Sequence, residues 1–289
     1  MNIAADLRAL EERLEALRAG GAKIGFVPTM GNLHQGHLSL IQQARDAADR
    51  VVVSIFVNPM QFAAHEDLDT YPRTLEADLS ALRQASVDLV FTPGTSDMYP
   101  QGSENETTIH VPMLGDGLCG RDRPGHFDGV CTVVYKLFQL VQPDVAIFGE
   151  KDLQQLLIIK KMTRDLRLPI DIRGGATQRA DDGLALSSRN QYLSTAERAI
   201  APLLWNTLQN CAEKLSGCPE EETQPLLSNA RETLEQAGFS VDYLDLRTLS
   251  TLSTTCDTRE DCALFVAARL GRTRLIDNIQ ISACPPLSG

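Results

Sequence analysis

The sequence predicts an α/β protein in which a doubly wound parallel sheet is followed by a smaller α+β domain. In the first part of the 289-residue chain, short runs rich in β-branched residues alternate with amphipathic helical segments. After about residue 176, two helical patterns are followed by three strand patterns. Alternation of this kind indicates a parallel sheet with helices on both faces, whereas grouped helices and strands are typical of an antiparallel α+β domain.

The first domain is expected over residues 1–176 and begins with an amphipathic helix pattern over residues 1–20. Its strands are predicted at residues 23–28, 51–57, 87–91, 144–148 and 169–172, and its helices near 37–49, 73–85, 129–141 and 152–166. The near-continuous apolar character of the strands fits a Rossmann-like sheet that is buried on both faces. Ligands bind such sheets at the carboxyl ends of the strands. Polar segments rich in glycine or proline follow four of the strands, at residues 28–37, 58–62, 91–100 and 149–152.

The second domain is expected over residues 177–289. Ser194 to Ser216 is predicted as one helix, because Ser194 and Glu197 have the spacing of a capping box. A second helix is predicted over residues 220–237, with Gly238 at its C-terminal end. Strands are predicted at residues 239–247, 261–268 and 273–281.

The composition excludes several classes of protein. With 43% hydrophobic and 22% charged residues the chain resembles ordinary globular proteins, and no apolar run approaches the roughly 20 residues that span a bilayer. The N-terminus lacks an apolar signal-peptide core, so we expect a cytoplasmic protein without a membrane partner. A net charge of −11 disfavours nucleic acid as a partner, since phosphate backbones bind basic surfaces. The seven cysteines form no CxxC pair and are interpreted as reduced, mostly structural thiols.

Two histidines, His34 and His37, lie in a turn between a predicted strand and a predicted helix. The unpaired amides of a helix N-terminus bind phosphate well, and Gly31 and Gly36 allow close approach of the backbone. Imidazoles add donors that can carry positive charge near neutral pH. A metal site is the alternative, but no third ligand has suitable spacing. The turn therefore predicts phosphate binding and resembles the HIGH-type signature of nucleotidylyltransferases and class I aminoacyl-tRNA synthetases.

Two further segments carry groups that suit phosphate. Residues 182–190 combine small residues with two hydroxyls and a guanidinium, which can donate to non-bridging oxygens; the alternative is a plain helix-capping loop before Ser194. This loop is similar to the KMSKS-type loop of the same superfamily. At residues 149–152 a strand meets a helix, so that Lys151 can contact a phosphate and Asp152 can cap the helix or hold a magnesium-bound water.

Six colinear motifs between residues 23 and 195 together resemble the pantothenate synthetase family. They are PTMGNLHQGHLSL, SIFVNPMQF, DLDTYPRTLEADL, GHFDGVCTVVYKLF, PDVAIFGEKDLQQLLIIKKM and DGLALSSRNQYLS. The resemblance implies an ATP-dependent, AMP-forming condensation of pantoate with β-alanine through a pantoyl-adenylate intermediate. It also implies ATP as a substrate, Mg²⁺ bound to phosphate oxygens, and a homodimer. The C-terminal third of the chain carries little of the resemblance.

The resemblance assigns roles to individual residues. It places His37, His34, Lys151 and Arg189 in the catalytic role, with His37 as the acid. Gln61 and Gln155, helped by Asn58 and Met60, are implied to bind pantoate and β-alanine, and Tyr71, Arg123 and His126 lie in neighbouring family segments. Position 178, usually valine in this pattern, is Gln178 here. The implied ATP site comprises Met30, Gly31, Asn32, Leu33, His34, Gln35, Gly36, His37, Gly149, Glu150, Lys151, Asp152, Gln178, Leu186, Ser187, Ser188 and Arg189.

Two other functions share some of these features. A nucleotidylyltransferase that attaches AMP or CMP to a phosphorylated acceptor would use the same histidine turn and sheet. A nucleotide-sensing or RNA-binding module descended from a synthetase is the other alternative, which the acidic charge disfavours. The second domain is expected to act as a lid, because Ser187 to Arg189 lies near the inferred domain junction; such a lid would shield an adenylate from water.

Overall fold

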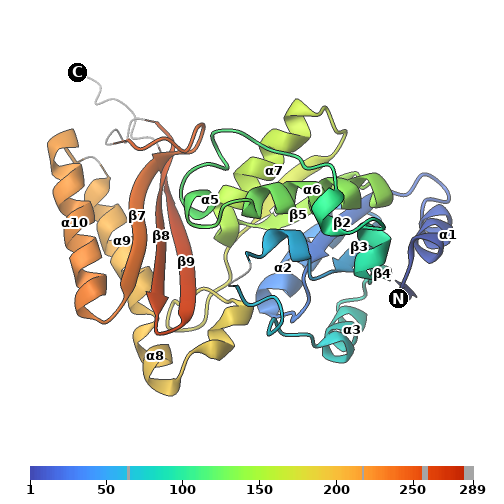
Figure 1. Cartoon of the computed structure of the whole chain (residues 1–289), viewed down its shortest axis with the longest axis horizontal. Coiled ribbons are helices and arrows are strands. Elements are labelled where there is room, and N and C mark those ends of the chain that lie inside the picture. The colour runs from blue at the N-terminus through green and yellow to red at the C-terminus, as the bar shows by residue number, and fades with distance from the viewer. Residues whose placement is uncertain (64–65, 217, 256–259, 283–289) are drawn as a thin grey trace. The chain divides into compact units, whose positions relative to one another are not determined.

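The computed structural model describes residues 1–63, 66–216, 218–255 and 260–282. It divides into two compact units, which we call unit 1 and unit 2 (Figure 1). Unit 1 comprises Met1–Asp116, Arg123–Glu150 and Gln154–Thr177. Unit 2 comprises Gly117–Asp122, Lys151–Leu153 and Gln178–Gly289. Each unit therefore consists of three separate segments, and the chain passes between the units several times.

Unit 1 is built on a six-stranded parallel sheet, which confirms the predicted class. The strand order is β1-β4-β3-β2-β5-β6, so the order reverses between β2 and β5. Ligands of doubly wound sheets bind at such a switch point, beyond the carboxyl ends of the strands. The strands are β1 (Asn2–Ala4), β2 (Ile24–Thr29), β3 (Arg50–Ile55), β4 (Leu89–Phe91), β5 (Val145–Gly149) and β6 (Asp171–Gly175).

Helices cover both faces of this sheet. On one face, Leu40 and Ile41 of α2 (Gln35–Ala47) and Leu82 of α3 (Leu75–Gln84) belong to the same buried cluster as Val27 and Val53 of the sheet. On the other face, Phe138 of α6 (His126–Val141) lies edge-on to Phe26 and Phe148, with ring centroids 6.4 and 6.2 Å apart.

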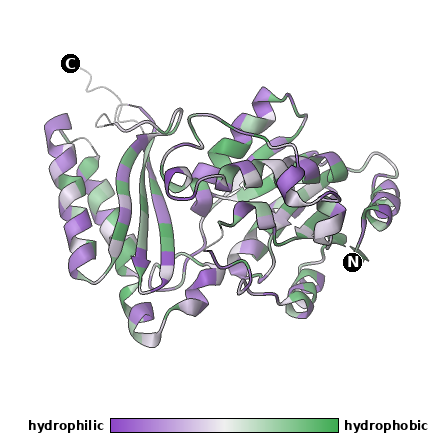
Figure 2. Cartoon of the chain, viewed as in Figure 1, coloured by the Kyte–Doolittle hydropathy of each residue, from purple (hydrophilic) through white to green (hydrophobic). Residues whose placement is uncertain are grey.

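Unit 1 contains further helices and 3-10 turns. They are the α-helices α1 (Leu7–Leu17), α4 (Thr95–Met98) and α7 (Leu153–Asp165), whose first residue is assigned to unit 2, and the 3-10 turns η1 (Pro59–Gln61) and η2 (Ser103–Asn105). Hydrophilic and hydrophobic residues alternate along many of the helices (Figure 2). This pattern is expected of helices that bury one face.

The N-terminal segment differs from the prediction of a helix over residues 1–20. Asn2–Ala4 form β1, which pairs with β4, and the Asn2 amide donates to the Asp88 carbonyl at 2.8 Å. The helix begins only at Leu7, after Asp6 accepts from the Ala9 amide as its N-cap. Three residues are too few for strand periodicity to be visible, so only the partner strand defines β1.

Unit 2 contains a three-stranded antiparallel sheet, which confirms the predicted α+β character of this part of the chain. Its strands are β7 (Ser240–Thr248), β8 (Cys262–Leu270) and β9 (Thr273–Ile281). Leu204, Leu208 and Leu234 of the helices share one buried core with Leu264 and Val266 of the sheet. The helices are α5 (Cys119–Asp122), α8 (Thr195–Ile200), α9 (Leu203–Leu215) and α10 (Glu220–Gln236), and the 3-10 turns are η3 (Glu150–Asp152), whose first residue is assigned to unit 1, and η4 (Ser188–Tyr192).

The prediction of a single helix from Ser194 to Ser216 is wrong. The chain forms two helices, α8 and α9, with Ala201 and Pro202 between them. Proline has no amide hydrogen to donate to the preceding turn, and its ring crowds the carbonyl there, so the helix is interrupted. The capping box predicted from Ser194 and Glu197 is present, and Gly238 takes a positive φ of 95° just after α10.

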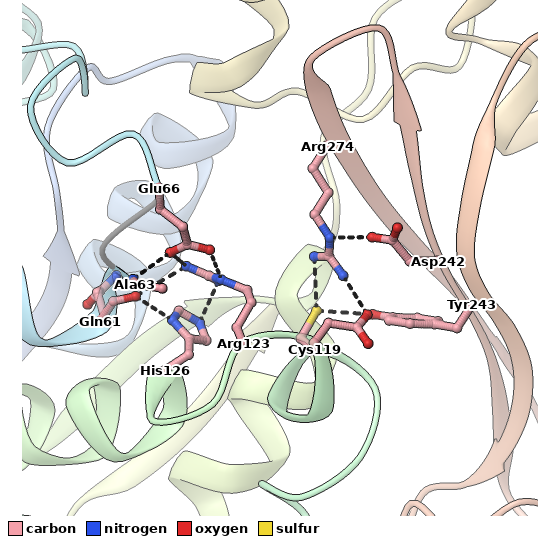
Figure 3. Close-up of polar contacts among 10 residues, drawn as sticks. Gln61, Ala63, Glu66, Cys119, Arg123, His126, Asp242, Tyr243 and Arg274 are labelled. Carbon is pink, nitrogen blue, oxygen red and sulfur yellow. Dashed lines mark hydrogen bonds and ion pairs between the residues drawn. The ribbon is translucent and has the colours of Figure 1, made fainter.

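A polar cluster holds the short segment Gly117–Asp122 within unit 2 (Figure 3). The Cys119 thiol lies 3.0 Å from the Tyr243 hydroxyl. The Arg274 guanidinium donates to Cys119 Sγ at 3.4 Å, to Asp122 at 3.3 Å and to Asp242 at 2.8 Å. One arginine of the antiparallel sheet therefore fixes both ends of helix α5.

The cysteines that the structure describes, Cys119, Cys131, Cys211, Cys218 and Cys262, are all free thiols. Burial raises the pKa of Cys131 to about 12 and that of Cys211 to about 11, which keeps both protonated at neutral pH. Cys256 and Cys284 lie outside the described residues. Among the described helices, none has both the length and the apolar character that a membrane crossing requires.

Candidate active site

The predicted histidine turn joins β2 to α2 at the switch point of the unit 1 sheet. His34 is the N-cap of α2 in extended conformation, and its Nδ1 accepts from the Gly36 amide at 3.1 Å. His37 Nδ1 accepts from the His34 amide at 3.2 Å, so the two imidazoles act together as a capping box. Their ring centroids lie 4.1 Å apart. The histidines thus have a local structural role that the sequence interpretation did not include.

These hydrogen bonds determine which ring nitrogen can donate. Because each Nδ1 accepts from a backbone amide, it carries no hydrogen, and the hydrogen of each neutral ring is at Nε2. Protonation of Nδ1 would remove the acceptor and break the capping bond. The sequence left open which imidazole is charged; this geometry is that of two neutral rings that can each donate from Nε2.

Asp78 of α3 shapes the same turn and is buried, at 3% exposure. Its two carboxylate oxygens accept from the Asn32 and Leu33 amides at 2.9 and 2.8 Å. Both Gly31 and Asn32 have positive φ, 79° and 50°, and a Cβ on Gly31 would lie 3.0 Å from Asp78 Oδ2. Glycine at position 31 therefore allows the carboxylate to reach the turn.

Asn58, predicted to help shape the substrate pocket, is the centre of a buried network after β3. It is 1% exposed, and its Nδ2 donates to the Gly129 carbonyl of α6 at 3.1 Å. Its Oδ1 accepts from the Tyr99 hydroxyl at 2.7 Å and from the Met60 amide at 3.3 Å. Burial raises the pKa of Tyr99, so the phenol keeps the hydrogen that it donates. A Cβ on Gly129 would lie 2.3 Å from the Met60 carbonyl, so α6 and η1 pack in backbone contact.

The Gln61 side chain lies between this network and the histidine turn. Its Oε1 accepts from Asn58 Nδ2 at 3.2 Å, and its Nε2 lies 3.0 Å from Met30 Sδ. Met30 is the first residue of the predicted ATP segment, whereas Gln61 is a predicted substrate residue. The fold of unit 1 therefore brings the two groups side by side, although 30 residues separate them in sequence.

Residues 149–155 follow the other strand of the switch point. Gly149 ends β5 and Glu150 belongs to unit 1, whereas Lys151 and Asp152 belong to unit 2. The four residues lead through the 3-10 turn η3 directly into α7, and Gln155 lies partly exposed in the first turn of α7. Within unit 2, the Lys151 carbonyl accepts from Asn278 Nδ2 of β9 at 3.0 Å.

The second predicted phosphate segment forms a small hairpin in unit 2. The Leu186 amide donates to the Gln178 carbonyl at 2.9 Å, which places two predicted ATP residues side by side. Arg179 pairs with Ala185 as an isolated β-bridge, and Gly183 turns the chain with a φ of 90°. At position 178, where the family pattern usually has valine, the carbonyl thus has a backbone role that does not depend on the side chain.

Ser187, Ser188 and Arg189 follow the hairpin. Ser187 is the N-cap of η4, and its Oγ accepts from the Arg189 amide at 3.3 Å. Asn190 Nδ2 donates to the Ala185 carbonyl at 2.9 Å, which ties the turn back to the hairpin. Ser187, Ser188 and Arg189 are all partly exposed. The loop is therefore an ordered turn with two hydroxyls and a guanidinium at its surface.

Four residues with a role in this architecture were missed by sequence reasoning: Asp78, Tyr99, Asp277 and Asn278. Asp78 and Tyr99 hold the two loops of unit 1, and the neighbouring β9 residues Asp277 and Asn278 hold the hairpin and Lys151 in unit 2. Asp277 and Asn278 give one signal in the sequence, since they are two adjacent polar residues inside a predicted strand, whereas Asp78 and Tyr99 give none. Within the described parts of the chain, no group of three or more His, Cys, Asp or Glu side chains has an arrangement that could hold a metal ion.

Comparisons with known proteins cover nearly the whole chain. A sequence model of the family described as pantoate-beta-alanine ligase matches residues 2–280. The pantothenate synthetase of Pseudomonas paraeruginosa is 52% identical over 281 residues, which cover 97% of this chain and 99% of that protein. The crystal structure of pantothenate synthetase from Thermus thermophilus has a TM-score of 0.90 at 44% identity and covers 98% of this chain and 100% of that one.

A further similar structure was determined as a complex with ligands. It is the crystal structure of pantoate-beta-alanine ligase from Francisella tularensis, complexed with beta-gamma ATP and beta-alanine. Its TM-score is 0.80 at 36% identity, and the match covers 96% of this chain and 97% of that one.

Proposed function

The chain belongs to the pantoate–β-alanine ligase family, and from this membership we propose that it condenses pantoate with β-alanine at the expense of ATP. The observation that carries the proposal to the level of residues is the contact between Gln61 and Met30 in unit 1. A neutral amide that can both donate and accept lies beside the first residue of a phosphate-binding turn. Such a group suits an acceptor with hydroxyls and a carboxylate.

The first step joins pantoate to AMP. A carboxylate oxygen of pantoate bonds to the α-phosphorus of ATP while the bond to the bridging oxygen breaks, and pyrophosphate leaves. A carboxylate is already a nucleophile, so the step needs placement and neutralisation of phosphate charge rather than a general base. We assign this task to His34, His37, Lys151 and Arg189, with Ser187 and Ser188.

The second step makes the amide bond. The amine nitrogen of β-alanine attacks the acyl carbon of the pantoyl adenylate, the bond from that carbon to the phosphate oxygen breaks, and AMP leaves as the amine loses a proton. In our assignment Gln61 and Gln155, with Asn58 and Met60, hold the substrates during this exchange. The neutral Nε2–H tautomer of His37 suits a hydrogen-bond donor toward a leaving phosphate oxygen.

We assign Mg²⁺ as an ion that accompanies ATP. Asp152 offers an exposed carboxylate in η3, and Mg²⁺ typically binds one or two carboxylates together with substrate phosphates and water. In this assignment Asp152 would hold the ion, directly or through water. When bound, the ion would neutralise phosphate charge.

Three further features belong to the proposal. We assign residues 177–289 the role of a lid that shields the adenylate from water, and we assign the protein a cytoplasmic location and a homodimeric state. The lid is tested by small-angle scattering and loop proteolysis with and without ATP plus pantoate. If both measurements are unchanged by the substrates, the lid is ruled out. Light scattering tests the homodimer, and cell fractionation tests the location.

Exchange of labelled pyrophosphate into ATP tests the reaction. We expect exchange that requires pantoate and does not require β-alanine, and AMP release with both substrates. If a phosphorylated acceptor supported the exchange in the absence of pantoate, the protein would instead be a nucleotidylyltransferase. Absence of exchange together with tRNA binding at physiological salt would indicate an RNA-binding module.

Lys151 provides the local test of the adenylation site. Replacing Lys151 with alanine should lower pantoate-dependent exchange by about 100-fold if the ammonium stabilises charge in the transition state. Lys160→Ala is the matched control, since Lys160 is an exposed lysine of α7. A loss confined to the β-alanine step would contradict the role assigned to Lys151.

A further inference from the structure

The main-chain carbonyl of Gln61 is held by the side chains of Arg123, which lies just before α6, and of His126, the first residue of α6 (Figure 3). Arg123 Nη2 donates to it at 3.2 Å, and His126 Nδ1 lies 2.8 Å from it. The His126 amide donates to the Arg123 carbonyl at 3.1 Å, so the two side chains come from one turn of backbone. All three residues are partly buried and lie in unit 1.

The hydrogen bonds define the state of the His126 ring. A carbonyl oxygen only accepts, so Nδ1 carries the hydrogen that it donates to Gln61. Nε2 lies 2.9 Å from Arg123 Nη1, which only donates, so Nε2 is the acceptor. His126 is therefore a neutral bridge from the guanidinium to the Gln61 carbonyl, and both of its ring nitrogens are used.

Arg123 also pairs with Glu66. Its Nε and Nη2 donate to the two carboxylate oxygens of Glu66 at 2.5 and 2.7 Å, and the two side chains are only 16% and 17% exposed. The same carboxylate accepts from the Ala63 amide at 3.2 Å. One guanidinium thus ties the main chain at Gln61 to the carboxylate of Glu66.

We propose that Arg123 and His126 are positioning residues that set the affinity for pantoate by fixing the Gln61 backbone. This inference rests on the proposed function, in which the Gln61 amide contacts pantoate. The Gln61 side chain is oriented from one end by Asn58 and Met30, and its backbone is oriented from the other end by Arg123 and His126. Neither positioning side chain needs to touch the substrate for this role.

Variants at His126 separate positioning from packing. His126→Ala removes both hydrogen bonds and should weaken pantoate binding about tenfold, the loss that one hydrogen bond to a fixed group produces. His126→Asn keeps a donor in the place of Nδ1 and should recover most of the affinity. Arg123→Lys keeps the charge without the planar fork and should lie between the wild type and His126→Ala. His110→Ala is the control, because His110 is an exposed histidine that pairs with Asp128 at 2.9 Å.

Two measurements are made on the full-length chain: direct pantoate binding by calorimetry, and KM and kcat in pyrophosphate exchange. We expect the pantoate Kd and KM to rise together while the KM for ATP changes less than about twofold. Unchanged pantoate affinity in His126→Ala and Arg123→Lys, or an equal rise in the KM for ATP, would overturn the inference. A wild type that binds pantoate without exchange would overturn only the proposed function; a wild type that does not bind pantoate would overturn both.

Discussion

Arg179 and Asp277 form a bidentate ion pair in unit 2, with Nη1 to Oδ2 at 2.6 Å and Nη2 to Oδ1 at 2.9 Å. The Asp277 side chain is 2% exposed, and the guanidinium lies over the Trp205 ring, 3.3 Å from its centroid. Arg179 Nη1 also donates to the Gly183 carbonyl at 3.1 Å. The pair therefore fastens the hairpin of the second phosphate segment to strand β9.

Replacing Asp277 with asparagine should destabilise unit 2, because it leaves the Arg179 charge without its counter-ion. Breaking one partner of a buried pair costs about 3–5 kcal/mol. Trp205, the single tryptophan of the chain, contacts this arginine, so its fluorescence during urea unfolding reports the change. Asp182→Asn is the matched control: the Asp182–Arg198 pair has the same 2.6 Å length but is 38–43% exposed, and its loss should cost at most about 1 kcal/mol. Equal losses in both variants would contradict this explanation.

Asp78→Asn should weaken ATP binding. An amide can accept from only one of the two backbone amides of Asn32 and Leu33, and its NH₂ group would face the other. Loss of one such buried bond costs about 1–3 kcal/mol, so the KM for ATP should rise about tenfold or more. Glu76→Gln, at an exposed position of the same helix, is the control. A KM for ATP that stays the same in Asp78→Asn would show that the turn does not depend on this carboxylate.

Two variants at His37 separate capping from chemistry. His37→Ala removes the acceptor of the His34 amide and also Nε2, and should lower pantoate-dependent exchange by about 100-fold. His37→Asn offers an acceptor in the place of Nδ1 but no donor in the place of Nε2. We expect it to restore thermal stability without restoring exchange. Recovery of exchange in His37→Asn would mean that the ring acts only as a cap.

The Glu66–Arg123 pair should make stability depend on pH at the acid end. Burial raises the pKa of Glu66, but the hydrogen bond and charge of Arg123 outweigh it and hold the pKa below its ordinary value of 4.5. A carboxyl with a lowered folded pKa stabilises the protein above the unfolded value, and this contribution disappears as the pH falls through the folded value. Wild type should therefore be more stable than Glu66→Gln near neutral pH, and the difference should shrink below pH 4.5. Parallel stability curves for the two proteins over this range would refute the prediction.

Local pattern was enough to predict most elements of this fold. The five strand patterns predicted in the first part of the chain became β2 to β6, and the capping box of Ser194 and Glu197 began a helix at the predicted residue. Two predictions failed for reasons of context. Strand β1 is defined only by its pairing with β4, and Pro202 interrupts a helix whose apolar periodicity continues on both sides.

The candidate site follows the same division. The sequence by itself predicted which residues carry the chemistry, namely His34, His37, Lys151 and Arg189, from their side-chain types at predicted strand and loop ends and from the family resemblance, and their roles stay predictions. Only the tertiary structure decided how they are held. It placed Asp78 beneath the histidine turn, Gln61 beside Met30, and Arg123 against Glu66. These contacts join residues about 30 to 60 positions apart in the sequence. Their geometry depends on how distant segments pack together, which local sequence periodicity does not encode.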